Sequence, residues 1–498
     1  MRIVSGTAHL VRFLTRLLVR VAVIIAVVAA TIVLVRAFDS RRMPDLETWH
    51  NIPLENEFRA ETFDGGTFDD YLALEEETFR ELDEKVYTDM GPEGRKVLNR
   101  FHRGSRAHPG NLGTNWNRTF EMAPAGPPVG GILLVHGLTD SPYSVRRIAE
   151  IFRDRGFYVL APRMPGHGTA PSGLLTATWR DWMAVMRLAV VRVRDVVGDG
   201  VPLYAGGYSN GGALAVKYTL DSLEDEKLET PARVFLFSPA IGITKFAAFA
   251  TWHKALSFIP WFEKFKWESI YLEYDPYKYN SFPKNAGHQS YALAEAIWAQ
   301  IQELSGRRAL GKLPPAIAFQ SVVDATIVTP SLVDRLFDSI ETAGSELVLF
   351  DINRSSRLKP FLKHNADGFL SMLEKREDLP FSLTVITGED EPAGRVVALR
   401  RGIGTQELGE REALGFSWPE GVYSLSHVAI PFTPDDPVYG GSPGEGSTGP
   451  TLGTLRPLGE KGVTTVPIGM LMRLRYNPFF PYMEERIIAF CPDCREMP

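Results

Sequence analysis

The sequence has little cysteine and no excess of positive charge. Its 498 residues include 2 cysteines, and its 54 lysines and arginines are outnumbered by 60 aspartates and glutamates, which gives a formal net charge of -6. Without a basic field the surface does not attract phosphates, so we expect no nucleic-acid partner. No internal repeat is visible either, which excludes an array of repeated units.

Both cysteines lie near the end of the chain, at Cys491 and Cys494 of the motif CPDC. One such pair cannot form a disulfide framework, and without a second pair it is weak evidence for a metal site. We therefore expect no metal and interpret the pair as two idle thiols or a simple disulfide. The remaining composition, with 44% hydrophobic and 23% charged residues, is typical of a globular protein. The length of 498 residues could hold two or three average domains, and it also permits one large core with additions.

A long apolar run stands near the N-terminus, in LLVRVAVIIAVVAATIVLVR. It carries no charge from Val21 to Val35, and it extends back to Leu17 if Arg20 reaches toward the membrane interface. That length, about 19 residues, is close to the roughly 20 that span hydrocarbon, so we expect a membrane anchor. The alternative is a signal peptide, cleaved at the small-x-small site that ends at Ala37.

Arginines flank this run on both sides. Four of them precede or enter it: Arg2, Arg12, Arg16 and Arg20. The positive-inside rule therefore places the N-terminus in the cytoplasm and the rest of the chain on the extracytoplasmic (periplasmic) side. Arg36, Arg41 and Arg42 on the other side weaken this orientation. After signal cleavage the chain would instead be secreted.

The chain divides into three parts. Residues 1–38 form a cytoplasmic tip and the anchor or signal peptide, residues 39–117 a linker with a surface helix, and residues 118–498 a folded domain. In the second part, DDYLALEEETFRELDEKVY has apolar residues at helical spacing, and we interpret its charged residues as a solvated face.

From about residue 118 onward, apolar β-rich runs alternate with helical patterns. This alternation predicts an α/β fold with a mostly parallel central sheet and helices on both of its faces. Two stretches interrupt it. Residues 243–313 are rich in aromatic side chains, and we expect them to form an inserted lid. Residues 354–420 form a second insertion, in which FSLTVITGE and GRVVALRRG predict extra strands at the sheet edge.

The segment YAGGYSNGGALAV places a serine between glycines, where an apolar run typical of a strand gives way to a helical pattern. A serine on such a sharp turn projects its hydroxyl outward, and Gly207 and Gly211 avoid collision with the neighbouring backbone. Ser209 is therefore the candidate nucleophile. The alternative is a glycine-rich turn whose serine only caps the helix.

A serine nucleophile needs a base, and the base needs a carboxylate that orients it. Asp324 ends the apolar run PPAIAFQSVVD and is the candidate carboxylate, with a helix cap as the alternative role. His427 follows a β-like run late in the chain and is the favoured base, because the order Ser, Asp, His is typical of such a core. His364, which is closer to Asp324 in sequence, is the alternative base.

The negative oxygen of a tetrahedral intermediate needs hydrogen-bond donors. Asn210, which follows the candidate nucleophile, offers one backbone N–H at the start of the predicted helix. The motif LLVHGLTDSP offers a second, because His136 and Gly137 end a buried strand and the N–H of Leu138 can face the same pocket. His136 precedes the nucleophile and lies in the wrong loop for a base, so we interpret it as structural.

Together, LLVHGLTDSP, APRMPGHG, GGYSNGG, the aspartate of SVVD and a late histidine resemble the α/β-hydrolase superfamily. Within it, HGLTDSP followed by PGHG is similar to the group of monoacylglycerol lipases, lysophospholipases and serine aminopeptidases. The resemblance covers about residues 118–353 and resumes near His427, after an insertion that is unusual for the group.

This resemblance implies an α/β-hydrolase fold and a serine hydrolase without cofactor. Ser209 would be its nucleophile, Leu138 and Asn210 its oxyanion donors, and the lid would cover an acyl pocket. The resemblance does not fix the substrate, because one fold serves many chemistries.

Three functions therefore remain open. The first is a membrane-tethered hydrolase of carboxylic esters, acting on acyl esters such as monoglycerides or lysophospholipids. The second function uses the same catalytic residues to cleave a different bond. The chain would then be a thioesterase, or an aminopeptidase whose acidic subsite would be Glu263, Glu268 or Glu273. The third is a hydrolase-shaped envelope scaffold without turnover. The sequence carries no signature of an oligomeric state.

Overall fold

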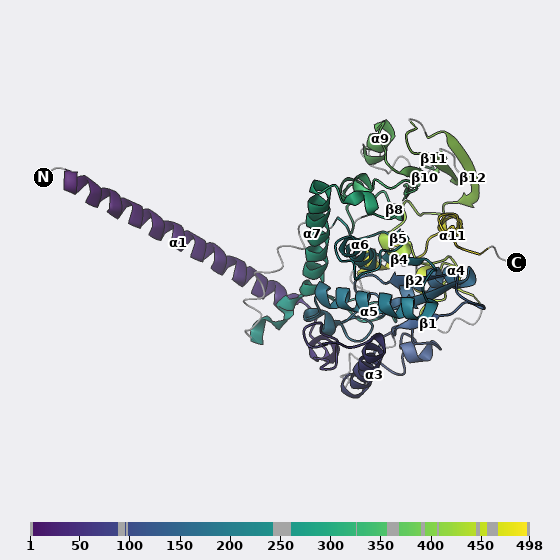
Figure 1. Cartoon of the computed structure of the whole chain (residues 1–498). Coiled ribbons are helices and arrows are strands. Elements are labelled where there is room, and N and C mark those ends of the chain that lie inside the picture. Colours follow the sequence, from purple (N-terminus) through teal and green to yellow (C-terminus); the bar gives the residue numbers. More distant parts are fainter. Residues whose placement is uncertain are drawn as a thin grey trace.

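The computed structural model describes residues 3–87, 95, 98–242, 260–324, 326–355, 368–389, 394–405, 408–444, 449–455 and 467–495. Figure 1 shows one long helix, α1 (Ile3–Arg42), projecting away from an α/β body that holds the other labelled elements.

One 10-stranded sheet runs through this body in the order β1-β3-β2-β4-β5-β8-β9-β10-β11-β12. Its strands are β1 (Phe120–Met122), β2 (Gly130–Val135), β3 (Phe157–Ala161), β4 (Leu203–Tyr208), β5 (Arg233–Phe237), β8 (Ala316–Ser321), β9 (Glu346–Phe350), β10 (Ser382–Gly388), β11 (Arg395–Arg401) and β12 (Glu410–Ser417). Neighbours from β3 to β10 are parallel, whereas β1, β11 and β12 pair antiparallel at the two edges. The predicted mostly parallel sheet is confirmed.

Helices cover both faces of the sheet. Those of the body are α2 (Thr48–Asn51), α3 (Phe68–Lys85), α4 (Arg146–Asp154), α5 (Trp179–Val197), α6 (Asn210–Ser222), α7 (Lys284–Gly306), α8 (Thr329–Arg335), α9 (Gly368–Lys375), α10 (Ile468–Leu471) and α11 (Phe480–Ala489). In β2, Leu133 and Val135 join the core beneath α5 and α6, whereas Ile132 and Leu134 join the core beneath α4 and α11. This alternation follows the two-residue period of a strand.

The linker predicted for residues 39–117 is wrong for the described part of that segment, which packs against the domain. Phe58 and Tyr71 are buried in the main core. The fully buried guanidinium of Arg163, which follows β3, lies 2.9 Å from a carboxylate oxygen of Glu57 and 3.3 Å from one of Glu75. The helical spacing predicted α3 correctly. Glu75 is not part of a solvated face, because it is buried against Arg163, a residue far away in sequence.

The described part of the expected lid, residues 260–313, contains two kinds of structure. A 3-10 turn, η5 (Pro260–Lys266), leads into a ribbon of β6 (Trp267–Ser269) and β7 (Phe282–Pro283). The following α7 buries Leu293 and Ile297 in the main core, so it belongs to the helical layer and not to a lid. The predicted aromatic stretch over 243–259 lies outside the described residues.

The insertion predicted over 354–420 lengthens the sheet. Its two expected strands are confirmed as β10 and β11, and β12 follows them. Because β10 pairs parallel with β9, these strands continue the central sheet. After β12, Trp418 and Leu425 are buried in the core beneath α4 and α11, which brings the chain back to His427. The long sequence spacing before this histidine is therefore a sheet extension.

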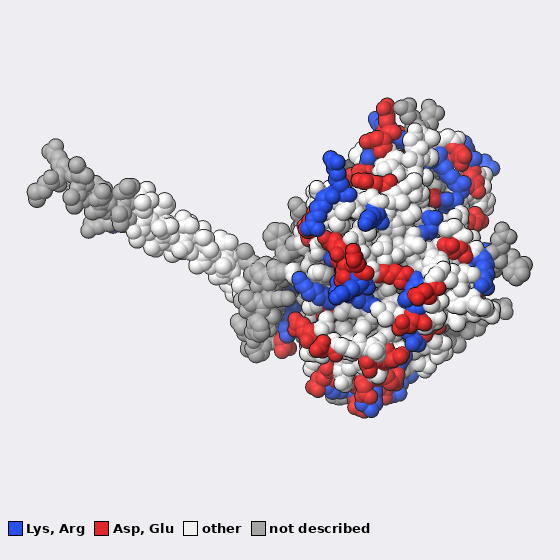
Figure 2. Space-filling model, viewed as in Figure 1, with Lys and Arg blue, Asp and Glu red and all other residues white. Residues whose placement is uncertain are grey.

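The N-terminal helix has the length and composition of a membrane span. Its stretch Phe13–Val35 has a mean hydropathy of 2.9, and none of that stretch is buried against the body. Figure 2 shows a continuous uncharged surface along the middle of α1 on the side in view. A signal sequence near an N-terminus has the same properties.

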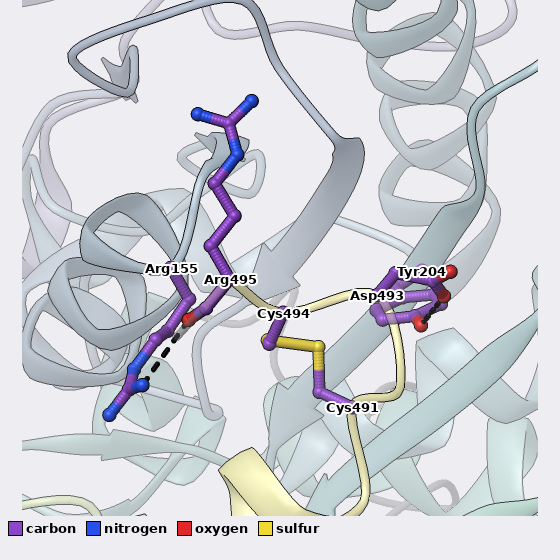
Figure 3. The surroundings of a disulfide bond; sticks show 6 residues. All are labelled: Arg155, Tyr204, Cys491, Asp493, Cys494 and Arg495. Carbon is purple, nitrogen blue, oxygen red and sulfur yellow. Dashed lines mark hydrogen bonds between the residues drawn. A yellow bond between two sulfur atoms is a disulfide. The ribbon is translucent and has the colours of Figure 1, made fainter. Parts of the chain in front are cut away.

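The two cysteines form a disulfide at the end of the described chain, one of the two interpretations that the sequence allowed. Figure 3 shows it beside hydrogen bonds that fix the tail to the body. The guanidinium of Arg155 donates to the carbonyl oxygen of Arg495 at 3.2 Å, and the Tyr204 hydroxyl donates to the Asp493 carboxylate.

Candidate active site

Ser209 lies on the sharp turn between β4 and α6. Its φ of 55° and ψ of -116° are rarely adopted by a residue with a side chain, and such strain is typical of functional turns. A Cβ at Gly207 would lie 2.4 Å from the carbonyl carbon of Gly211, and a Cβ at Gly211 would lie 2.1 Å from the carbonyl oxygen of Val135. Both positions therefore require glycine, as the motif predicts.

The structure brings together the three residues that the sequence singled out for nucleophilic chemistry. His427, at the start of a 3-10 turn, places Nε2 3.0 Å from Oγ of Ser209. Its Nδ1 lies 2.8 Å from Oδ2 of Asp324, which follows β8. Ser209 and His427 are buried, with exposed fractions of 8% and 5%. His364, the alternative base, lies outside the described residues.

Asp324 is held as a carboxylate by several donors. Its Oδ1 accepts the backbone N–H groups of Thr326 at 2.7 Å and Ile327 at 2.9 Å, and Gln320 Nε2 donates to Oδ2 at 2.9 Å. Burial acts to raise the pKa of this carboxyl, but the interaction with His427 and the hydrogen bonds from Ile327 and Ser238 outweigh it and lower the pKa. A carboxylate on Nδ1 keeps the proton there and leaves the lone pair of Nε2 facing Ser209.

Ser238, which the sequence analysis missed, completes this network. Its Oγ lies 2.8 Å from Asp324 Oδ2, 2.9 Å from His427 Nδ1 and 3.1 Å from Gln320 Oε1. It directly follows β5, the strand that pairs with β4, so it lies at the same sheet edge as Ser209. This position at a parallel strand's carboxyl end is the signal that could have found it.

The two expected oxyanion donors lie at the ends of neighbouring strands. Leu138 follows β2, Asn210 begins α6, and β2 pairs with β4. Within the described part of the chain, neither backbone N–H donates to a protein acceptor. Both donors therefore remain available to a ligand.

His136 has a structural environment, as predicted. Its Nε2 accepts the backbone N–H of Met164 at 3.0 Å, so Nδ1 carries the proton and donates to the carbonyl oxygen of Gly137 at 2.9 Å. Burial lowers the pKa of His136 to about 3, which keeps the ring neutral. A Cβ at Gly137 would lie 2.8 Å from Oδ2 of Asp140, which explains this glycine.

A cavity of about 300 Å³ opens beside these residues. Thr139 and Val428, which follow Leu138 and His427 in sequence, are part of its wall. The wall combines aromatic rings with four charged side chains: Glu268, Lys278, Arg473 and Arg475. Among the described residues, no group of three or more His, Cys, Asp or Glu side chains could hold a metal ion.

Known proteins resemble this chain in the region that carries the site. Residues 126–349 match the model of the family described as serine aminopeptidase, S33, a range that includes Ser209 and Asp324 and ends before His427. A 54-residue stretch is 44% identical to the thermostable monoacylglycerol lipase of Bacillus sp. (strain H-257). That stretch is 11% of this chain and 22% of the relative, so the chain matches about a fifth of the relative's length.

Solved structures of lipolytic enzymes are also similar. One from a study of the metagenome-derived enzymes LipS and LipT is 21% identical, with 52% of this chain and 98% of that chain covered and a TM-score of 0.36. The monoacylglycerol lipase of Paleococcus ferrophilus is 20% identical, with 47% and 87% covered and a TM-score of 0.34. The family match over residues 126–349, together with the mostly parallel sheet between two helical layers, gives this chain an α/β-hydrolase fold, and over those residues it resembles the serine aminopeptidase S33 family.

Proposed function

We propose that the chain is a serine hydrolase that cleaves carboxylic esters, with acyl lipids such as monoglycerides or lysophospholipids as substrates. The observation that carries the proposal is the continuous set of contacts from Asp324 through His427 to Ser209, at 2.8 and 3.0 Å. Hydrogen bonding at these distances is what proton transfer from a serine hydroxyl requires. The 54-residue match to a monoacylglycerol lipase supports the same chemistry.

In the proposed reaction, Nε2 of His427 removes the hydroxyl proton of Ser209 while Oγ attacks the ester carbonyl carbon. The carbonyl oxygen becomes anionic and accepts hydrogen bonds from the N–H groups of Leu138 and Asn210. Collapse of this intermediate breaks the ester bond, and the leaving alcohol takes the proton from His427. Water, deprotonated by the same nitrogen, then releases the carboxylic acid and restores Ser209.

The charges of the cavity favour an ester over the substrate of an aminopeptidase. An aminopeptidase needs a carboxylate for the substrate's ammonium group, but the wall offers a single one, Glu268, beside the cation Arg473. Its two other cations, Lys278 and Arg475, pair with carboxylates behind the wall. Glu273 is fully buried and accepts the backbone N–H groups of Asn280 and Ser281, so it cannot reach a ligand. Glu263 lies exposed on η5 and is not part of the cavity wall.

We propose that α1 anchors the domain on the extracytoplasmic side of a membrane. The arginines before the apolar run support this orientation, and the disulfide between Cys491 and Cys494 supports an oxidising compartment. Lys264 Nζ lies 3.0 Å from the carbonyl oxygen of Met43 and 2.9 Å from Oδ1 of Asp45, just after α1. Since η5 leads into β6, whose Glu268 lines the cavity, this contact would keep the cavity close to a lipid surface.

The test is a substrate panel with the full chain in detergent micelles. We expect p-nitrophenyl esters to be cleaved with a preference for one range of chain lengths, and aminoacyl anilides to remain intact. Ser209→Ala should lower kcat by roughly 10⁴-fold or more, because nucleophile and base act as a unit. Thioesters of matched acyl length decide between esterase and thioesterase. Folded wild-type protein that cleaves none of these would favour the scaffold alternative and contradict the proposal.

A further inference from the structure

The loop that carries Leu138 is strained. We use the name oxyanion loop for residues 136–140. Thr139, in its middle, has a φ of 64°, a left-handed conformation that is unfavourable for a β-branched residue. Such a conformation persists only where surrounding contacts impose it. Within the loop, the N–H of Asp140 donates to the carbonyl oxygen of Gly137 at 3.2 Å.

Two contacts from one segment hold this loop from outside. The backbone N–H of Tyr279 donates to the carbonyl oxygen of Thr139 at 2.8 Å. The neighbouring Lys278 places Nζ 2.9 Å from Oδ2 of Asp140, whose side chain is 7% exposed. Burial raises the pKa of this carboxyl, and the charge and hydrogen bond of Lys278 act in the opposite direction. The ammonium group therefore favours the charged, hydrogen-bonded state of Asp140.

The segment that presents Lys278 is held by hydrogen bonds of its own. It is the 273–281 turn, between β6 and β7, and its own side chains close it. Glu273 accepts the N–H groups of Asn280 at 2.8 Å and Ser281 at 2.9 Å, and Asn280 Oδ1 accepts the N–H of Asp275 at 3.1 Å. Internal bonds of this kind fix the position from which Lys278 reaches the oxyanion loop.

Contacts with the body of the domain also hold the same turn. The ring of Tyr277 stacks on Tyr143 at a centroid distance of 4.0 Å, and the Tyr279 hydroxyl donates to the carbonyl oxygen of Gly166 at 3.2 Å. Asp275 lies 3.4 Å from the guanidinium of Arg475.

We propose that Lys278 is a positioning residue for the reaction: from the 273–281 turn it holds Asp140, and with it the oxyanion loop, so that the N–H of Leu138 faces the substrate's developing oxyanion. The inference rests on the proposed function. The segment between β6 and β7 would then affect the rate of the reaction, because an oxyanion donor such as the N–H of Leu138 loses most of its effect when it is displaced by about 1 Å.

The test compares Lys278→Met, which keeps an apolar stem and removes the charge, with Lys278→Arg. The matched control is Lys312→Met, since Lys312 is exposed on η6 (Leu310–Lys312) and has no ion pair within the described chain. We expect Lys278→Met to lower kcat for a p-nitrophenyl ester about 10- to 100-fold with little change in KM. Lys278→Arg should restore most of the rate, and Lys312→Met should match wild type.

A trifluoromethyl ketone separates positioning from a general structural role, because its hemiketal oxygen occupies the oxyanion site. Its affinity should fall by the same factor as kcat in Lys278→Met. If this variant does not fold, Asp140→Asn together with Lys278→Met removes both charges and should show the same loss of kcat. Unchanged kcat and inhibitor affinity in either folded variant would overturn the inference.

The rate of backbone amide hydrogen exchange tests the positioning role of Lys278 without any measurement of turnover. The amides of Asp140 and Tyr279, which donate to Gly137 and Thr139, should exchange at least about tenfold faster in Lys278→Met. If wild-type protein cleaves no ester, the proposed function fails, and the exchange rates still decide whether Lys278 holds the loop. Unchanged exchange would overturn the positioning role.

Discussion

The glycine at position 211 offers a direct test of the turn that presents Ser209. A methyl group there, in Gly211→Ala, would lie 2.1 Å from the carbonyl oxygen of Val135 and 2.6 Å from that of His136, where ordinary contact begins at 3.4 Å. The start of α6 and the end of β2 would have to separate by more than about 1 Å, because backbone atoms on both sides leave no flexible side chain to give way.

Two magnitudes follow from this displacement. Overpacking of a close-packed interior costs about 1–3 kcal/mol of unfolding free energy. A shift of about 1 Å between the nucleophile and the oxyanion loop costs about 100-fold in rate, because the reacting atoms leave their productive geometry. The loss of activity should therefore exceed what the loss of stability alone explains.

The assay pairs urea unfolding, followed by tryptophan fluorescence, with the second-order rate of labelling by a fluorophosphonate. The matched control is Gly306→Ala at the end of α7, where a Cβ meets nothing within 4 Å. The control should stay within about 0.5 kcal/mol of wild type and label at the same rate. If Gly211→Ala were as stable and as reactive as wild type, the account of the turn would be refuted.

Four further predictions concern other parts of the molecule. Ser238→Ala should lower kcat about tenfold at unchanged KM in steady-state assays, because one charge-assisted hydrogen bond to Asp324 is lost. His427→Ala should abolish fluorophosphonate labelling, whereas His364→Ala should leave it intact, and the reverse result would exchange their roles. Burial raises the pKa of Glu273 from 4.5 to about 7, so folded protein holds a proton that unfolded protein releases. Wild type should therefore lose up to about 3 kcal/mol of unfolding free energy relative to Glu273→Gln as pH rises through this interval, and parallel pH profiles would contradict this. Cys494→Ser should lower the unfolding free energy by at most about 2 kcal/mol, because the disulfide closes a very short loop, and a change in kcat would contradict its purely structural role.

The residues that sequence reasoning found are those whose signal is local. The glycines around Ser209 identify it as a candidate nucleophile, and its place at the end of an apolar run identifies Asp324 as a candidate carboxylate. The sequence also predicts the strands over FSLTVITGE and GRVVALRRG, because their apolar pattern has the period of a strand. In each case the information lies within about ten residues of the feature.

The residues that it missed depend on partners far away in sequence. Ser238 matters because β5 pairs with β4, and Lys278 because the 273–281 turn packs on the oxyanion loop. The sequence around Glu75 is typical of a solvated helix face, and only the folded structure shows that Glu75 pairs with Arg163. Burial of a charged residue follows from tertiary pairing, which a single sequence does not display.

The central claim is that Ser209 carries the activated hydroxyl. Full-length protein treated with a fluorophosphonate and digested should yield one modified peptide, with the added mass on Ser209, and none in folded Ser209→Ala. A folded wild-type protein that takes up no label, or whose label lies on Ser238 or another serine, would contradict the account.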